Sequence, residues 1–284
     1  MSNPSAPVDS LALIAARRKF DQNDDGKSIA VESNVDADAF MDVSERLSGH
    51  IGAARMSLDE NGVLNIVSVP DRPHNNAVAN VSEQLNNIVR QNGWGSFIRV
   101  SGGLDIKVGP ATVQRPDVCV SHKIRGGSKV VPGRPHYPRV IFEIQTKHAN
   151  VRQLHNLASD YLSTRNPTTN DFEVAVVVGL LFYDQRVDGT SAALCIVLER
   201  HMLPTTAISF GSAEVDAQTD NTFAQLYPNV MISRLPRTDG AAIYVFGSWI
   251  WHNWPQGSQL PANFQSAGTI NLHEVFDEVV RDFD

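Results

Sequence analysis

The spacing of apolar residues divides the first half of this chain into a hairpin, a helix and three strands. The segment "ARMSLDENGVLNIVSV" (54–69) alternates apolar and polar residues on either side of an Asn-Gly pair, which predicts a β-hairpin. The next segment predicts a helix that stops at Gly93. Its apolar residues at helical spacing are Ala77, Val81, Leu85 and Ile88. The strands that follow are expected over about 96–108, 116–121 and 139–147.

The pattern continues with a second helix and a strongly apolar hairpin. "NVRQLHNLASDYLSTRNP" predicts a helix with Asn150 as its N-cap and Pro167 beyond its end. Residues 172–184 are apolar at almost every position, as in a strand buried on both faces, and residues 191–201 pair with them as a hairpin. Within residues 202–284, "AAIYVFGSWIWHNWP" predicts a strand that ends in an aromatic cluster, and "LHEVFDEVVRDF" predicts a closing helix. The order helix, three strands, helix, strand favours an α/β (α+β) fold with a mixed sheet and helices packed on it.

The overall composition is that of a globular protein, with 42% hydrophobic and 19% charged residues. No apolar run approaches the twenty residues of a membrane span, and the N-terminus lacks the features of a signal peptide. We therefore expect an intracellular protein, cytoplasmic or nuclear, with no membrane partner. The predicted domains are a polar, partly disordered leader over 1–50, a core over 51–201, and a C-terminal extension over 202–284 that packs on the core.

Positive charge is concentrated in the middle of an acidic chain. The net charge is −7, but residues 99–165 contain 11 Lys and Arg against 4 Asp and Glu, a balance of +7. Within them, residues 122–139 have five basic residues, no acidic residue, and several Gly and Pro, which predicts a long irregular loop. We expect this loop to contact a phosphate backbone, with a solvated surface linker as the alternative. The candidate contacts are Lys123, Arg125, Lys129 and Arg134.

A row of polar residues follows one face of the strand "RVIFEIQTK". Glu143, Gln145 and Lys147 occupy every second position, while the residues between them are apolar. Asp117 begins the preceding predicted strand, in "RPDVCVS", and we expect its carboxylate and that of Glu143 to converge at one end of the sheet. Two carboxylates suit Mg²⁺ or Mn²⁺, which can activate water and stabilise charge on a phosphate. A salt-bridged strand edge is the structural alternative.

These two segments together resemble the core motifs of the PD-(D/E)XK nuclease superfamily, and are most similar to its Uma-type restriction endonuclease branch. "NGVLNIVSVPDRPHNNAVANV" and "AGTINLHEVF" are similar to further segments of that branch. The resemblance implies a restriction-endonuclease-like sheet with the core order α-β-β-β-α-β and with N- and C-terminal extensions. It also implies a metal-dependent nuclease, acting on nucleic acid and specifically DNA, whose Mg²⁺ or Mn²⁺ is bound by Asp117 and Glu143.

The chain departs from this family at Gln145, where the family usually has Lys. Lys147 lies on the same strand face and is expected to replace that lysine, so the catalytic set is Asp117, Glu143, Gln145 and Lys147. The alternative is a nuclease fold without cleavage, acting as a nucleic-acid-binding or protein-binding effector. A homodimer would let two such sites address two strands.

The resemblance also implies accessory residues on the two helices that flank the strands. These are Glu83 on the first helix, and Gln153 and Tyr161 on the second. Ordinary polar helix faces are the alternative for all three. Three histidines are further candidate ligands, with packing as their alternative role: His74, His148 and His155. Three tryptophans either stack nucleobases or pack in a core or dimer surface: Trp249, Trp251 and Trp254.

Overall fold

The protein is described from a computed structural model, which divides the chain into two compact units. One unit comprises residues 1–71 and 104–115, and the other comprises residues 72–103 and 116–284. The structure describes residues 29–32, 35, 55–58, 61, 63–68, 71–102, 106–108, 113–123, 138–146, 149–165, 172–200, 204–235, 240–251 and 260–281. The leader predicted over residues 1–50 lies almost wholly outside this set.

The smaller unit contains a five-stranded antiparallel sheet in the order β1-β3-β2-β6-β5. Its strands are β1 (Ile29–Glu32), β2 (Arg55–Leu58), β3 (Leu64–Ser68), β5 (Ile106–Lys107) and β6 (Val113–Gln114). The pairing of β2 with β3 confirms the hairpin predicted over 54–69. Leu58, Leu64 and Val113 are fully buried, so this sheet has an apolar face of its own.

The larger unit is built on a mixed seven-stranded sheet in the order β12-β11-β10-β9-β8-β7-β4. Its strands are β4 (Ile98–Ser101), β7 (Val118–His122), β8 (Val140–Gln145), β9 (Val176–Phe182), β10 (Ala192–Glu199), β11 (Pro204–Gly211) and β12 (Ser233–Arg234). Two neighbouring pairs are parallel, β8 with β9 and β11 with β12, and the other pairs are antiparallel. The predicted mixed α/β fold is therefore confirmed.

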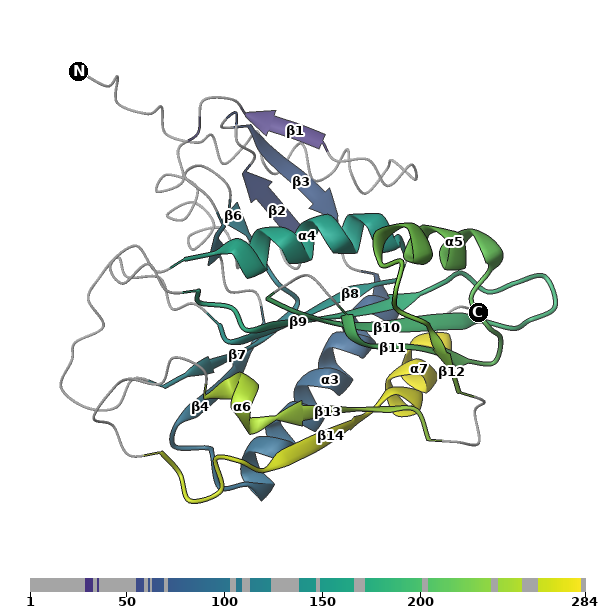
Figure 1. The fold of residues 1–284 in the computed structure, drawn as a ribbon. Helices are drawn as coiled ribbons and strands as arrows, with labels where there is room; N and C mark the ends of the chain where they lie inside the picture. The colour runs from purple at the N-terminus through teal and green to yellow at the C-terminus, as the bar shows by residue number, and fades with distance from the viewer. Residues whose placement is uncertain are drawn as a thin grey trace. The chain divides into compact units, whose positions relative to one another are not determined.

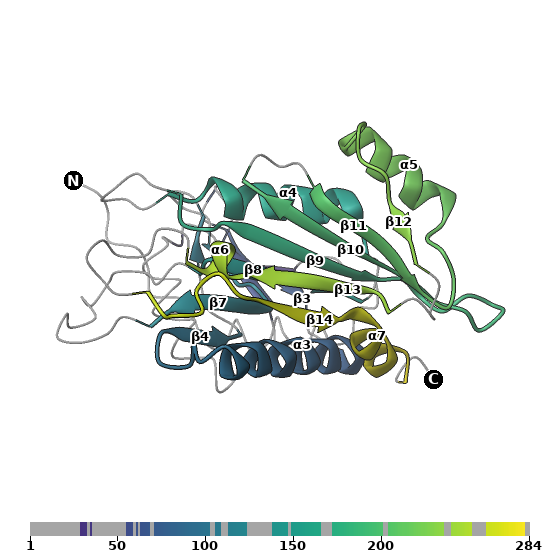
Figure 2. The same ribbon diagram turned by 60° about the horizontal axis from the view of Figure 1, so that its bottom comes forward.

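Helices cover both faces of this larger sheet (Figures 1 and 2). The elements on one face are α3 (Arg72–Gln91), α7 (Leu272–Val280) and a ribbon of β13 (Ala242–Phe246) with β14 (Ala267–Asn271). The other face has α4 (Val151–Ser163) and α5 (Ala217–Leu226). The short helix α6 (Gly247–Ile250) follows β13. Along the chain, the first elements of this unit are α3, β4, β7, β8, α4 and β9, which is the predicted order of helix, three strands, helix and strand.

The helices form where the apolar spacing predicted them. The stripe from Ala77 to Ile88 is the buried face of α3 and packs in the main core. The helix ends before Gly93, whose φ of +68° lies in the left-handed region that glycine adopts without steric cost. Asn150 caps α4, because its side-chain oxygen accepts hydrogen bonds from the backbone N–H groups of Arg152 and Gln153. These two predicted helices are thus confirmed, and α7 confirms the predicted closing helix.

Two predictions about strands were wrong or incomplete. The single strand expected over 96–108 is two strands in different sheets, since β4 joins the main sheet and β5 joins the smaller one. The sequence has a Gly-Gly pair at 102–103, and the backbone of Gly102 approaches the carbonyl oxygen of Asp117 so closely that a Cβ there would lie 2.8 Å from it. The pattern also missed β11, α5 and β12 within residues 202–284.

The tryptophans that the structure describes pack in the larger unit. Trp251 is 6% exposed, meets Trp94 edge-on and stacks on His122. Trp249 is partly buried against the same core. The core interpretation is therefore confirmed for Trp251, while Trp254 lies outside the described residues. In the described part of the chain, no helix combines the length and the apolar character that crossing a bilayer requires.

Candidate functional site

Asp117 immediately precedes β7 and Glu143 lies near the end of β8, on neighbouring strands of the larger unit. The two strands are antiparallel, with Val118 opposite Phe142, and one further step of this register places Asp117 opposite Glu143. Asp117 Oδ2 accepts a hydrogen bond of 2.7 Å from the backbone N–H of Ile144. This bond holds the Asp117 carboxylate against β8 at the residue next to Glu143. The structure thus places the two residues opposite each other on neighbouring strands, and their joint binding of a metal ion stays a prediction.

Glu143 is buried between strand β8 and helix α4. Its neighbours Phe142 and Ile144 point into the main core, so alternation along the strand turns Glu143 to the opposite face. The side chain is fully buried, and its Oε1 accepts a hydrogen bond of 2.7 Å from the hydroxyl of Tyr161, itself fully buried on α4. A buried carboxylate requires such hydrogen bonds, because burial without them costs several kcal/mol. Tyr161 is thus a direct partner of Glu143.

Gly179 creates the space that α4 occupies beside Glu143. It is the residue of β9 opposite Glu143 in the parallel pairing of β8 with β9. A Cβ at this position would lie 2.0 Å from Leu154 Cδ2 and 2.7 Å from Leu154 Cδ1. Helix α4 can pack this closely only because β9 has no side chain there.

We expect Gly179→Ala to reduce the free energy of unfolding by about 1–3 kcal/mol, because the added methyl group overpacks the contact between β9 and Leu154. Urea denaturation followed by circular dichroism measures this change. Gly95→Ala is the matched control, since a Cβ at Gly95 meets no atom within 4 Å. Equal stability of the two variants would contradict the proposed role of Gly179.

His74 supplies a second contact to Asp117 from the first turn of α3. Its Nε2 lies 3.2 Å from Asp117 Oδ1, and the two side chains are 12% and 8% exposed. The contact is an ion pair when the imidazole is protonated and a hydrogen bond when its Nε2–H is present. The carboxylate of Asp117 is therefore oriented by His74 on one oxygen and by the backbone of β8 on the other.

Gln145 connects the end of β8 to the start of α4. Its Oε1 accepts a hydrogen bond of 3.0 Å from the backbone N–H of Asn150, the residue that caps α4. The side chain of Gln145, the last residue of β8, is half-buried. The amide thus helps to position the helix that covers Glu143.

The donor set at the strand ends fits a hard divalent cation. Carboxylate oxygens are the ligands of Mg²⁺ and Mn²⁺, and Mg²⁺ is commonly bound by one or two carboxylates together with waters and substrate phosphate oxygens. Among the residues that the structure describes, no group of three or more His, Cys, Asp and Glu side chains is arranged to hold a metal ion. A structural zinc site, which needs four such ligands, is therefore not formed by these residues. Asp117 and Glu143 fit Mg²⁺ or Mn²⁺ better.

Two of the three accessory residues, Glu83 and Gln153, have exposed side chains. Glu83 is exposed on α3 and lies nine residues after His74, which is two and a half helical turns and hence the opposite side of the helix. Gln153 is exposed at the start of α4, whereas Tyr161 is buried. His155 contacts the hydroxyl of Tyr227 at 2.9 Å, and burial, with a smaller effect of the nearby Arg152 charge, lowers the pKa of His155. Of the accessory residues, the structure therefore brings only Tyr161 to the carboxylates.

Several predicted residues lie outside the part of the chain that the structure describes. They are Lys147, His148, Arg125, Lys129 and Arg134. Their predicted roles stay predictions. Lys123 is described and is exposed, at the end of β7. Arg139, the fifth basic residue of the segment 122–139, forms an ion pair of 2.5 Å with Glu173, and the two side chains are 12% and 6% exposed.

The sequence pattern did not clearly identify two residues of the site, His74 and Gly179. His74 was one of three candidate histidines, and only its place in the first turn of α3 distinguishes it from the others. Gly179 interrupts the apolar run of β9 and was not singled out. An isolated glycine within a strand often marks a close approach of another element, and this is the signal that could have identified it.

The geometry of the site is the basis for any assignment of function to this chain. At the ends of β7 and β8, Glu143 is paired with the Tyr161 hydroxyl from α4, and Asp117 is paired with the His74 imidazole from α3. No protein-family model matches the chain, and no curated protein is significantly similar to it in sequence.

Proposed function

We propose that this chain is a metal-dependent nuclease of PD-(D/E)XK type that hydrolyses phosphodiester bonds in DNA. The observation that carries the proposal is the pair of carboxylates, Asp117 and Glu143, on neighbouring strands. The element order α3, β4, β7, β8, α4, β9 supports it, because it is the α-β-β-β-α-β order that the resemblance implies. The set of basic residues within 99–165 supports a polyanionic substrate.

Each residue of the site has a distinct role in this proposal. Asp117 and Glu143 bind the divalent cation through carboxylate oxygens. Tyr161 orients Glu143 by donating a hydrogen bond from its hydroxyl to Oε1, and His74 orients Asp117 through the contact with Oδ1. Both are positioning residues, since they act through the carboxylates. Lys147 is the cation expected beside the scissile phosphate, since the amide of Gln145 is neutral.

The cation would supply the chemistry that the side chains lack. When bound, Mg²⁺ or Mn²⁺ lowers the pKa of a bound water and stabilises the negative charge that develops on the phosphate. The protein holds the two ligands in place before the substrate arrives, because hydrogen bonds from Ile144 and Tyr161 already fix their oxygens. Such preorganisation is a major source of rate enhancement at charged transition states.

Asp117→Asn is expected to weaken Mn²⁺ binding at least tenfold, because it removes a negatively charged ligand while keeping an oxygen that can accept the Ile144 hydrogen bond. Isothermal titration calorimetry measures this change without any need for turnover. The same proteins are then incubated with plasmid and single-stranded DNA in Mg²⁺ or Mn²⁺. We expect cleavage by the parent chain only, and Mn²⁺ binding of equal strength in the variant would exclude Asp117 as a ligand.

A nuclease fold that binds nucleic acid without cleaving it is the second candidate. The observation in its favour is Gln145, which stands where the family usually has Lys and whose amide oxygen is used in a contact with Asn150. The variant Gln145→Lys separates the two candidates. Cleavage that appears only in this variant would support the binding protein, whereas cleavage by the parent chain would support the enzyme.

A further inference from the structure

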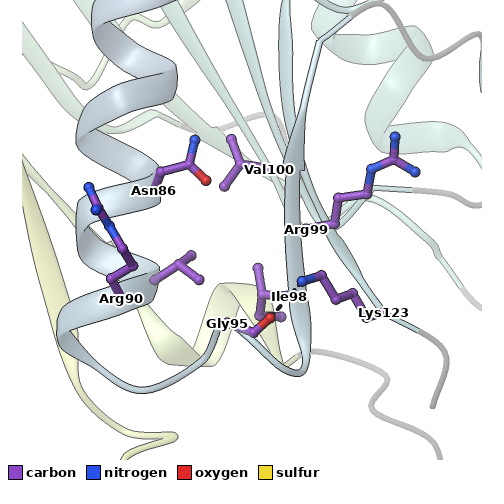
Figure 3. A pocket seen from close by; sticks show the side chains of 8 residues that line it. Asn86, Arg90, Gly95, Ile98, Arg99, Val100 and Lys123 are labelled. Atoms are coloured by element: carbon purple, nitrogen blue, oxygen red, sulfur yellow. Dashed lines mark hydrogen bonds between the residues drawn. The ribbon is translucent and has the colours of Figure 1, made fainter.

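A basic pocket lies between α3 and the edge strand β4, in the larger unit (Figure 3). Its volume is about 380 Å³. The lining residues are Asn86, Val89, Arg90, Gly95, Ile98, Arg99, Val100 and Lys123. Figure 3 shows Asn86 and Arg90 on the helix, Ile98 and Val100 turned from β4 toward the helix, and Arg99 extending from the other side of the strand. Apolar side chains thus fill the space between helix and strand, and three cationic residues contribute to the wall, with the Arg99 guanidinium on the opposite side of β4.

The three cations have no carboxylate partner among the described residues. None of the ion pairs formed there involves Arg90, Arg99 or Lys123, and no acidic residue lines the pocket. Lys123 Nζ donates a hydrogen bond of 2.6 Å to the carbonyl oxygen of Gly95, which uses one of the three donors of the ammonium group. Arg90 donates to the side-chain oxygen of Asn87. These neutral contacts hold Lys123 and Arg90 without neutralising their charges.

The distance between this pocket and the candidate metal site can be obtained along two elements, helix α3 and strand β7. Arg90 lies sixteen residues after His74 on α3, which corresponds to about 24 Å along the helix axis. Lys123 lies six residues after Asp117, which corresponds to about 20 Å along β7. Each of these two distances corresponds to the length of roughly six or seven nucleotides, at about 3.4 Å per nucleotide of one strand.

We propose that this pocket binds phosphate groups of the DNA backbone several nucleotides away from the scissile bond. The inference rests on the proposed function, because it identifies how the substrate of that same site is held. Arg90, Arg99 and Lys123 supply the positive charge, and arginine forks suit phosphate oxygens. The basic segment that follows Lys123 in the sequence continues the same charge. The site therefore has a minimum substrate length, since a short strand cannot occupy both places.

The test compares two triple variants that have the same change in charge. The pocket variant is Arg90→Gln/Arg99→Gln/Lys123→Gln. The control variant is Arg186→Gln/Arg234→Gln/Arg281→Gln, which changes exposed cations outside the pocket; Arg234 lies on β12, at the opposite edge of the sheet. Fluorescence anisotropy measures binding of labelled single-stranded DNA, about 4 and about 20 nucleotides long, in EDTA, so that no cleavage occurs.

We expect the pocket variant to bind the long strand at least tenfold more weakly, whereas the short strand, which cannot occupy both places, should bind weakly to all three proteins. The slope of log affinity against log salt should fall by roughly two to three, because each lost phosphate contact removes about 0.7–0.9. The control variant should differ little from the parent. Equal losses in both variants, or unchanged binding and slope in the pocket variant, would overturn the inference.

The outcome is separate from that of the proposed nuclease activity. If the chain does not cleave DNA but the pocket variant still loses affinity for the long strand, the proposed activity fails and the phosphate site stands. If the chain cleaves DNA and both variants bind equally well, the phosphate site fails and the activity stands. Thermal unfolding of all three proteins verifies their folding, which substitutions of exposed side chains should change little.

Discussion

Glu143→Gln should abolish metal-dependent cleavage, with a loss of at least about 1000-fold, or about 4 kcal/mol of activation free energy at 1.36 kcal/mol per tenfold. The substitution removes one of the two carboxylates but keeps the shape of the side chain. It also keeps an oxygen that accepts the hydrogen bond from Tyr161. A loss of activity would therefore reflect the missing negative charge and not a disturbed core. Single-turnover cleavage of plasmid DNA with Mg²⁺ or Mn²⁺ measures the effect.

Glu199→Gln is the matched control for this experiment. Glu199 ends β10 in the same sheet and takes no part in the contacts between Asp117 and Glu143. We expect this variant to cleave DNA as the parent does. The cleavage rate of Tyr161→Phe should lie between those of Glu199→Gln and Glu143→Gln. This variant leaves the Glu143 carboxylate in place but removes the hydroxyl that orients it. Cleavage at the parent rate by Glu143→Gln would refute the assignment of Glu143 as a metal ligand.

Arg139→Ala should reduce the free energy of unfolding by about 3–5 kcal/mol, the largest effect on stability that we expect in this chain. Arg139 Nη1 donates to Glu173 Oε2 at 2.5 Å and to the carbonyl oxygen of Glu173 at 2.7 Å. Both side chains are almost completely buried, so the variant leaves a glutamate with its principal charged partner removed. Urea denaturation and thermal unfolding measure the effect, with an expected fall in Tm on the order of 10 °C.

A pair at the surface provides the control for this prediction. Arg281 and Glu278 are separated by 2.7 Å, but the Arg281 side chain is 67% exposed, and Arg281→Ala should cost no more than about 0.5 kcal/mol. The double variant Arg139→Met/Glu173→Leu should recover most of the stability, because it removes both buried charges. An effect of Arg139→Ala no larger than that of Arg281→Ala would show that the buried pair contributes little.

The larger unit illustrates how much local patterns predict. The stripe of α3, the Asn150 cap of α4 and the apolar run of β9 were predicted correctly, because each depends on residues close together in sequence. The split of residues 96–108 between two sheets was not predicted. Strand pairing depends on residues far apart in sequence, and the alternation within one strand does not specify its neighbour.

The candidate site shows the same division. The sequence by itself determined that Asp117 stands at the start of a strand and that Glu143 lies on the polar face of another, because alternation assigns each residue to a face. Only the tertiary structure decided that Tyr161 bonds Glu143, that His74 reaches Asp117, and that Glu83 points away. These contacts depend on which helix packs on which face and at what rotation. That packing is set by the joint burial of many apolar residues across the sheet, and no short motif contains it.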